Sequence, residues 1–351
     1  MDIQRQFPGV HWIWGGGISF VYEVHPRIVV KVPQSGEFEK EQFSKELEIY
    51  QTFSQRPPCP SIVQCYFYTH NGIFLEYMRD ESLSSRIQDN HIRNHQTKVV
   101  TTVERLEPLP LRKEWMNDLA QAVAFLESLN LAHGDLRPEN ILLDRNRIKL
   151  SDFDCTAKIG TPHEACLAPY GRLLNDSEVE YGSRGSSGSL GPRTEQFALG
   201  SLYYLINYGF EVYGDRCLTE DPYEHGPKTV ELLQNMEFPK LDRDPAIDRI
   251  IDKCWHNRYA TVSELAAETK AILDEGADNE ATTTEFHHSN TRDDEDQHLF
   301  GGEFLSKKDF CQHLAKRGLL DLLSSGEPGQ LGFTLAWYRH CLSNVPSNNA
   351  S

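Results

Sequence analysis

Two motifs near the middle of the chain decide its fold. They are His133-Gly134-Asp135-Leu136-Arg137-Pro138-Glu139-Asn140 and Ser151-Asp152-Phe153-Asp154. Between them, two short apolar runs at 141–143 and 147–150 flank a turn, a pattern that predicts a β-hairpin. Because a hairpin brings its two ends together, we expect Asp135, Asn140 and Asp152 to gather around one point. Such a set of carboxylate and amide groups is suited to holding Mg²⁺ on a nucleotide phosphate and orienting an attacking hydroxyl.

The two motifs resemble the catalytic loop H-R-D-x-x-x-x-N and the D-F-G motif of protein kinases. This resemblance implies that Asp135 accepts the proton of the substrate hydroxyl and that Asn140 and Asp152 hold the metal. Arg137 stands where serine/threonine kinases usually carry a lysine that touches the transferring phosphate. The implied fold is α+β with two lobes: a small antiparallel β-sheet lobe with one helix, and a larger, mainly helical lobe.

Composition is consistent with such a protein. At 351 residues the chain exceeds the usual size of a single-core domain, so two lobes are expected. Its formal net charge of −17 argues against nucleic acid or an anionic membrane as partner. The eight cysteines form no C-x-x-C pair, which favours a reducing compartment. No apolar run is long enough to span a bilayer and no signal peptide is evident, so we expect an intracellular, cytoplasmic protein, with the nucleus as the alternative.

The small lobe is predicted over residues 10–80, beginning with two strands around the glycines at 15–17. If Val21 is the valine of G-x-G-x-x-G-x-V, then Gly16 alone matches a glycine of that motif, and Trp14 and Ser19 occupy the other two positions. Glycines allow backbone amides to approach phosphates closely, but an ordinary hairpin turn would show the same triplet. The resemblance places Gly16 and Val21 over the nucleotide.

A lysine and a glutamate are expected to pair in this lobe. The run Ile28-Val29-Val30-Lys31 resembles V-A-I-K, and strand alternation puts Val29 and Lys31 on one face. Residues 37–53 are predicted to form a helix whose apolar stripe runs through Phe43, Leu47, Tyr50 and Phe53. Glu46 lies beside that stripe and Glu48 lies opposite it, so Glu46 is the carboxylate that can turn inward to Lys31.

The remaining nucleotide contacts follow from the resemblance alone. Residues 73–78 read as a strand leading into a hinge, where the backbone at Glu76 and Met78 would bind adenine. Val29 and Leu142 would line the same nucleotide pocket. The implied cofactors are ATP and Mg²⁺.

The larger lobe is predicted over residues 81–273. A loop or short helix with a connector is expected at 80–110, then a helix at 112–130 with Trp115, Leu119, Val123 and Leu126 on one face. A mobile loop to Pro192 occupies the position of an activation loop but lacks A-P-E. The next helix resembles D-x-W-x-x-G, with Glu195 replacing the aspartate, and Arg258 has no A-P-E glutamate to pair with.

The resemblance covers residues 10–272, and the rest of the chain has a different character. Residues 274–298 are acidic, which is typical of a disordered linker. Within a helical tail at 299–351, two amphipathic helices are expected at 304–323 and 331–342. They would dock on the larger lobe or bind a partner.

Three functions are consistent with these motifs. The first is ATP- and Mg²⁺-dependent phosphoryl transfer to a serine or threonine hydroxyl of a protein, favoured by Pro138-Glu139-Asn140, 195–200 and 255–258. The second is a small-molecule phosphotransferase of the aminoglycoside or choline kinase type, in which H-G-D and D-F-D are familiar. The third is a pseudokinase acting as a nucleotide-binding scaffold, suggested by the altered glycine loop and D-F-G and by the missing A-P-E. Against this third reading, Lys31, Glu46, Asp135, Asn140 and Asp152 are all present.

Overall fold

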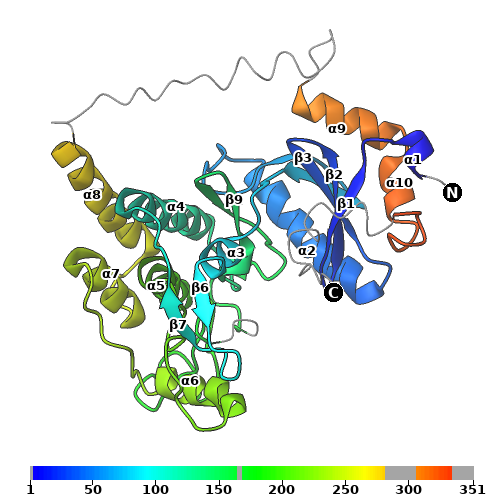
Figure 1. The fold of residues 1–351 in the computed structure, drawn as a ribbon. Helices are drawn as coiled ribbons and strands as arrows, with labels where there is room; N and C mark the ends of the chain where they lie inside the picture. Colours follow the sequence, from blue (N-terminus) through cyan, green and yellow to red (C-terminus); the bar gives the residue numbers. More distant parts are fainter. Residues whose placement is uncertain (1–2, 164–167, 281–305, 334–351) are drawn as a thin grey trace. The chain divides into compact units, whose positions relative to one another are not determined.

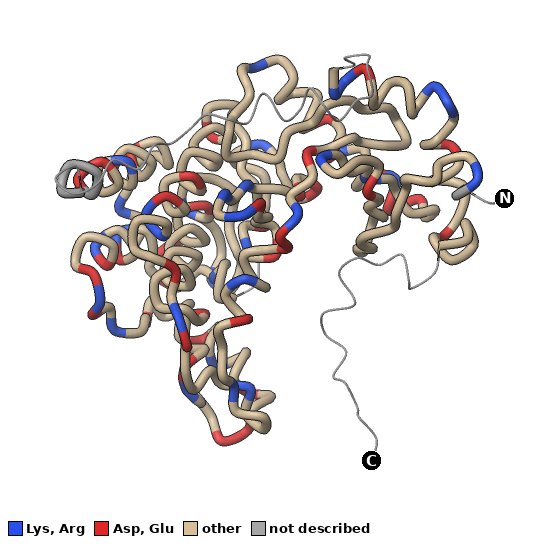
Figure 2. Tube along the Cα trace, turned by 45° about the horizontal axis from the view of Figure 1, so that its top comes forward, with Lys and Arg blue, Asp and Glu red and all other residues tan. Residues whose placement is uncertain are grey.

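The computed structural model describes residues 3–163, 168–280 and 306–333, which fall into two compact units (Figure 1). The small unit contains the described residues up to Pro58, residues 63–78 and the C-terminal residues 306–333. The large unit contains residues 59–62 and the described residues from Arg79 onward to 280. Basic and acidic residues are interspersed along the described chain (Figure 2). No helix in these three stretches is long and apolar enough to cross a membrane.

Strands of the small unit form an antiparallel sheet in the order β1-β2-β3-β5-β4. Their bounds are β1 His11–Gly15, β2 Ser19–His25, β3 Ile28–Pro33, β4 Cys65–Thr69 and β5 Gly72–Glu76. A short helix α1, Ile3–Gln6, precedes the sheet, and helix α2 spans Glu37–Phe53. The predicted small sheet with one substantial helix is therefore confirmed, and α2 has the predicted bounds.

The two faces of this sheet bury different kinds of side chain. Tyr22 lies opposite Val30 and Phe20 lies opposite Val32 in the β2–β3 register, and all four are buried. These residues belong to one apolar cluster on one face of the sheet. Lys31 alternates with them and turns to the other face.

The apolar face of this sheet is covered by the segment at 306–333. Helices α9, Lys307–Lys316, and α10, Leu319–Leu323, join the same buried cluster as Tyr22 and Val30. A side chain at Gly72 of β5 would collide with Leu320, which shows how closely α10 lies on the sheet. The Asn71 amide donates to Asp321 at 3.0 Å, and Lys307 Nζ lies 5.2 Å from the centre of the Tyr66 ring.

Two expectations for this segment need correction. The helix predicted at 304–323 is divided at Gly318, whose φ of +82° ends the first helix and starts the second. The segment packs on the small sheet, so the expected docking on the larger lobe is wrong, while binding of a partner stays a prediction. Residues 331–333 form a turn, and the remainder of the second predicted helix lies outside the described residues.

The large unit is mainly helical, as expected. Its longer helices are α4 Leu109–Ser128, α5 Pro192–Tyr208, α6 His225–Gln234, α7 Pro245–Trp255 and α8 Val262–Glu280. The predicted stripe of α4, namely Trp115, Leu119, Val123 and Leu126, is buried. Helix α5 is buried on all sides from Arg193 to Tyr208, so it forms the centre of this unit.

Short elements of the large unit complete the fold. They are α3 Leu83–Gln88, β6 His91–Arg93, β7 Val100–Val103, β8 Leu131–Ala132, β9 Ile141–Asp144, β10 Arg147–Leu150 and β11 Ala157–Lys158, with 3-10 turns at Pro138–Asn140 and Pro222–Glu224. The hairpin of β6 and β7 was not predicted within 80–110. Helix α8 runs to Glu280, past the boundary predicted at 273.

Candidate active site

Asp135 and Asn140 lie in the loop between β8 and β9 of the large unit. The Asn140 side-chain amide donates to the Asp135 backbone carbonyl at 2.9 Å and to its Oδ2 at 3.0 Å. Because Nδ2 makes both of these bonds, Oδ1 of Asn140 remains available as an oxygen donor to a cation. Arg137 Nε lies 3.2 Å from Asp135 Oδ2, with its side chain about half exposed.

The predicted hairpin of β9 and β10 brings the second motif to this loop. Ile141 pairs with Leu150 and Asp144 pairs with Arg147. At the end of the hairpin opposite the turn, the Ser151 backbone amide donates to the Asn140 carbonyl at 2.9 Å, and the Ser151 hydroxyl donates to the same oxygen at 2.8 Å. Asp152 follows in a left-handed conformation with φ of +64° and is close enough to raise the pKa of Asp135 through like-charge repulsion. The spacing of the two motifs therefore predicted this arrangement.

The buried side chain of His133 holds the two motifs together through its contacts. Its ring is fully buried, its Nε2 lies 3.0 Å from the Ser151 carbonyl, and it packs edge-on against Phe153. The Asp135 amide donates to His133 Nδ1 at 3.3 Å. Burial lowers the pKa of His133, which favours the neutral ring, and the contacts of that ring give it a structural role.

The carboxyl of Asp135 is tuned by opposing influences. Burial raises its pKa above the ordinary value, while Arg137 and the Asn140 hydrogen bond act to lower it. A carboxylate of raised pKa is a stronger proton acceptor, and its hydrogen bonds fix the direction in which it can accept. This geometry suits a general base.

Glu195 holds the start of the catalytic loop, a role that the sequence did not reveal. From the first turn of α5, its Oε2 accepts the His133 amide at 2.8 Å and its Oε1 accepts the Gly134 amide at 3.3 Å. The carboxyl is completely enclosed, and burial raises its pKa to about 7. The signal in the sequence was the match of 195–200 to a helix motif that normally begins with aspartate.

Gly134 itself is required by this backbone. Its φ is +79°, and a Cβ added there would lie 2.8 Å from the carbonyl oxygen of Cys155. Both facts exclude the arginine of H-R-D at this position.

The small unit carries the predicted ion pair. Lys31 Nζ lies 2.7 Å from Glu46 Oε2, and the two side chains are 8% and 1% exposed. Glu48, on the opposite side of α2, is exposed. A buried pair of this kind is poor evidence for stability, because desolvation offsets most of its attraction. It does fix the position of the lysine ammonium.

Outside the expected hinge, the other residues predicted to contact the nucleotide lie on strands of the two units or in the turn between β1 and β2. Gly16 donates its amide to the Ser19 carbonyl at 2.9 Å, and a side chain at Gly16 would collide with the Trp14 ring. Val21 lies opposite Lys31 in the β2–β3 register. Val29 is buried on β3, and Leu142 is half-buried on β9.

The expected hinge follows β5. Glu76 is the last residue of this strand, and its amide donates to the Gln64 carbonyl at 2.8 Å within the sheet. The Tyr77 amide donates to the Arg27 carbonyl at 3.0 Å. Met78, the last residue of the small unit in this part of the chain, is buried.

The donor set of the large unit fits a hard divalent cation. Among the described residues, no group of three or more His, Cys, Asp and Glu side chains could hold a metal by itself. Magnesium usually takes one or two carboxylates and fills its other positions with water and substrate phosphate. Asp152 together with Oδ1 of Asn140 meets that requirement.

Comparison with known proteins identifies the family. The model of the protein kinase domain matches residues 22–257, which is more than half of the chain. The chain belongs to the protein kinase family. MAP kinase-activated protein kinase 2 of Homo sapiens is 29% identical over 211 residues, covering 56% of this kinase and 46% of that protein. The same enzyme of Cricetulus longicaudatus is also 29% identical over 211 residues, covering 56% of each chain.

A plant relative shows a similar partial match. CBL-interacting protein kinase 10 of Oryza sativa subsp. japonica is 26% identical over 172 residues, covering 46% of this kinase and 33% of that protein. The chain spans about half the length of the curated relatives it matches first.

One departure from the family has a structural explanation. Arg258, which lacks an A-P-E glutamate, pairs instead with Asp252 at the end of α7, with Nη1 at 2.9 Å from Oδ2. The segment at 168–192 contains turns in place of the A-P-E helix. In it, the Leu174 amide donates to the Ser186 carbonyl, and the Gly185 amide donates to the Leu174 carbonyl.

Proposed function

We propose that this kinase transfers the γ-phosphoryl group of ATP to a serine or threonine hydroxyl of a protein, with Mg²⁺. The observation that carries the proposal is the set of hydrogen bonds joining Asp135, Asn140 and Ser151, which fixes a proton acceptor beside Asp152. The relatives named above are called protein kinases, which favours a protein acceptor. The tripeptide Pro138-Glu139-Asn140 favours serine or threonine over tyrosine.

Each residue then has a defined task. Lys31, fixed by Glu46, positions the α- and β-phosphates through its ammonium. Asn140 and Asp152 would hold Mg²⁺, which supplies neutralisation of phosphate charge when bound. Asp135 accepts the hydroxyl proton of the acceptor and aligns its oxygen, and Arg137 offers a donor to the transferring phosphate. Such catalysis consists mainly of positioning and charge stabilisation.

Replacing the proton acceptor tests this proposal. We expect Asp135→Asn to lower phosphate incorporation from ATP into a generic basic protein by at least about a hundredfold, since a general base usually contributes that much. The matched control is Asp144→Asn, which removes a carboxylate from the far end of the hairpin, where it pairs with Arg147. Equal incorporation by wild type and Asp135→Asn would contradict the role of Asp135, and no incorporation above background by either protein would indicate a pseudokinase.

A small-molecule acceptor is the second candidate. The glycine demanded at position 134 by the backbone reproduces the H-G-D motif familiar in aminoglycoside and choline kinases. The same assay with a panel of aminoglycosides and amino alcohols distinguishes a small-molecule kinase from a protein kinase. Incorporation into these acceptors but not into proteins would establish this second function.

A further inference from the structure

A cavity of about 680 Å³ lies in the large unit, at the start of helix α5. Its walls come from 159–160, 180–181, 189–193 and 257–260. Leu190, Pro192 and Tyr259 make much of the wall apolar. None of the residues assigned to phosphoryl transfer lines this cavity.

Arg193 is the charged group buried in the wall. Its residue is 7% exposed, and its Nη2 donates to the Ser187 carbonyl at 2.5 Å. Within the described part of the chain, no carboxylate lies within ion-pair distance of Arg193, and its Nε has no hydrogen-bond partner. Its guanidinium also stacks over the Tyr181 ring at 5.6 Å.

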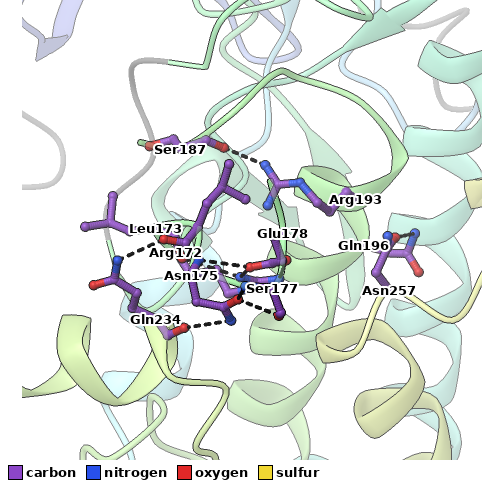
Figure 3. A network of polar contacts seen from close by, with 11 residues as sticks. Arg172, Leu173, Asn175, Ser177, Glu178, Ser187, Arg193, Gln196, Gln234 and Asn257 are labelled. Atoms are coloured by element: carbon purple, nitrogen blue, oxygen red, sulfur yellow. Dashed lines mark hydrogen bonds and ion pairs between the residues drawn. The ribbon is translucent and has the colours of Figure 1, made fainter. Parts of the chain in front are cut away.

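The neighbouring charges do not neutralise this cation. Glu178 is already engaged by Arg172 through two hydrogen bonds, with Nη1 at 2.6 Å from Oε2 (Figure 3). Arg172 and Glu178 together carry no net charge, so one positive charge remains on Arg193. Burial and the proximity of Arg172 both lower the pKa of Arg193, as expected where positive charge is in excess.

A buried cation without a counter-ion is costly, and proteins normally pair such groups. A second cation, Arg258, also lines the cavity, but it is exposed and pairs with Asp252. Glu180 also lines the cavity, but this residue is exposed to solvent. A ligand that fits this cavity carries an anionic group on an apolar or aromatic moiety. The anionic group would pair with Arg193, and the apolar part would contact the apolar residues of the wall. The cavity is far larger than a single ion.

We propose that this cavity binds an anionic side chain of a peptide or protein partner, either a carboxylate or a phosphate ester, with Arg193 as its counter-ion. The guanidinium geometry suits both groups, since two parallel N–H donors match two oxygens. This site is separate from phosphoryl transfer and does not depend on the function proposed above.

Capped amino acids are suitable probes. We would titrate the full chain with acetyl-phosphotyrosine amide, acetyl-phosphoserine amide and acetyl-glutamate amide, using ligand-observed NMR, and use acetyl-tyrosine amide as the neutral control. We expect at least one anionic probe to bind, the neutral probe to bind at least tenfold more weakly, and Arg193→Gln to weaken the anionic probe at least tenfold. The tighter of the phosphate and carboxylate probes identifies which anion the site prefers.

The control variant is Arg184→Gln, which removes the same charge from the same segment. Arg184 is 63% exposed and pairs with Asp176, so binding should be unchanged. If Arg193→Gln fails to fold, Ala260→Trp decides, because Ala260 is an exposed wall residue whose enlargement narrows the cavity. The proposal is overturned if no anionic probe binds at 10 mM, if the neutral probe binds equally, or if the deciding variant leaves binding unchanged.

Discussion

At the scale of single residues, Glu195 joins the central helix α5 of the large unit to the catalytic loop. Both of its oxygens accept backbone amides of the catalytic loop, from His133 and Gly134. An asparagine or aspartate at this position would be shorter by one methylene group and would reach these amides only if the loop or α5 moved. Glutamate in place of the usual aspartate therefore lets the carboxylate extend further from α5 to the backbone amides of the loop.

The buried carboxyl of Glu195 should make stability depend on pH. Its pKa rises from 4.5 to about 7 on folding, so the folded state holds the proton more tightly than the unfolded chain does. The resulting stabilisation is complete below about pH 4.5 and is lost as the pH rises through 7. The loss amounts to about 3 kcal/mol at most, at 1.36 kcal/mol per pKa unit.

Glu195→Gln removes this titration, because glutamine stays neutral. Urea unfolding at pH 5 and pH 8 should show that the wild type loses more stability between the two values than the variant does. Other groups titrate equally in both proteins and cancel in the comparison. Identical pH dependence would mean that the Glu195 carboxyl is not perturbed.

Gly134 allows a second test at this scale. We expect Gly134→Ala to lower the unfolding free energy by about 1–3 kcal/mol, and more than Gly160→Ala does, and to reduce turnover by moving Asp135. Gly160 also has a positive φ, +93°, but a Cβ there would meet no atom within 4 Å, so it isolates the backbone strain. Thermal unfolding and phosphate incorporation measure the two effects. Equal losses in both variants would contradict the predicted clash with Cys155.

At the scale of elements, the C-terminal helices α9 and α10 act as a second layer on the small sheet. Leu319, Leu320 and Leu323 are buried against β-strand residues such as Tyr22 and Val30. On the other face of the same strand β3, Lys31 is held by Glu46. The segment therefore stabilises the strand that carries the lysine, although it lies far from it in sequence.

Truncating Leu320 should measure this contribution. Leu320→Ala creates a cavity over Gly72 and is expected to cost about 2–5 kcal/mol of unfolding free energy, as for other buried leucines. Asp321→Ala, next to it, loses one exposed hydrogen bond to Asn71 and should cost less than about 1 kcal/mol. Hydrogen exchange should show faster exchange in β2 and β3 for Leu320→Ala. Faster exchange confined to 306–333 would contradict a role for the segment in the sheet.

At the scale of the whole molecule, local patterns predicted local structure well. The periodicity of 37–53 gave the bounds of α2 and selected Glu46 over Glu48, and the apolar runs on either side of 144–146 gave the β9–β10 hairpin. These features depend on neighbours a few residues apart, which a pattern can record. The hairpin of β6 and β7 was missed because its strands are short and polar and show no alternation.

Contacts between distant segments could not be predicted in the same way. An amphipathic helix shows that it needs an apolar partner but does not identify it, so the docking of α9 and α10 on the small sheet was open. The interaction of Glu195 with the loop at 133–134 spans 61 and 62 residues of sequence. Likewise, the cation excess around Arg193 emerges only when 172, 178 and 193 meet in space.

The layered small sheet also has a consequence for biosynthesis. A ribosome makes strands β1 to β5 before residues 306–333, so the apolar face of the sheet stays uncovered while the residues between them are synthesised. The fold of the small unit is complete only when α9 and α10 have left the exit tunnel and packed on the sheet. Until then the nascent protein is exposed to premature association, the hazard that chaperones relieve.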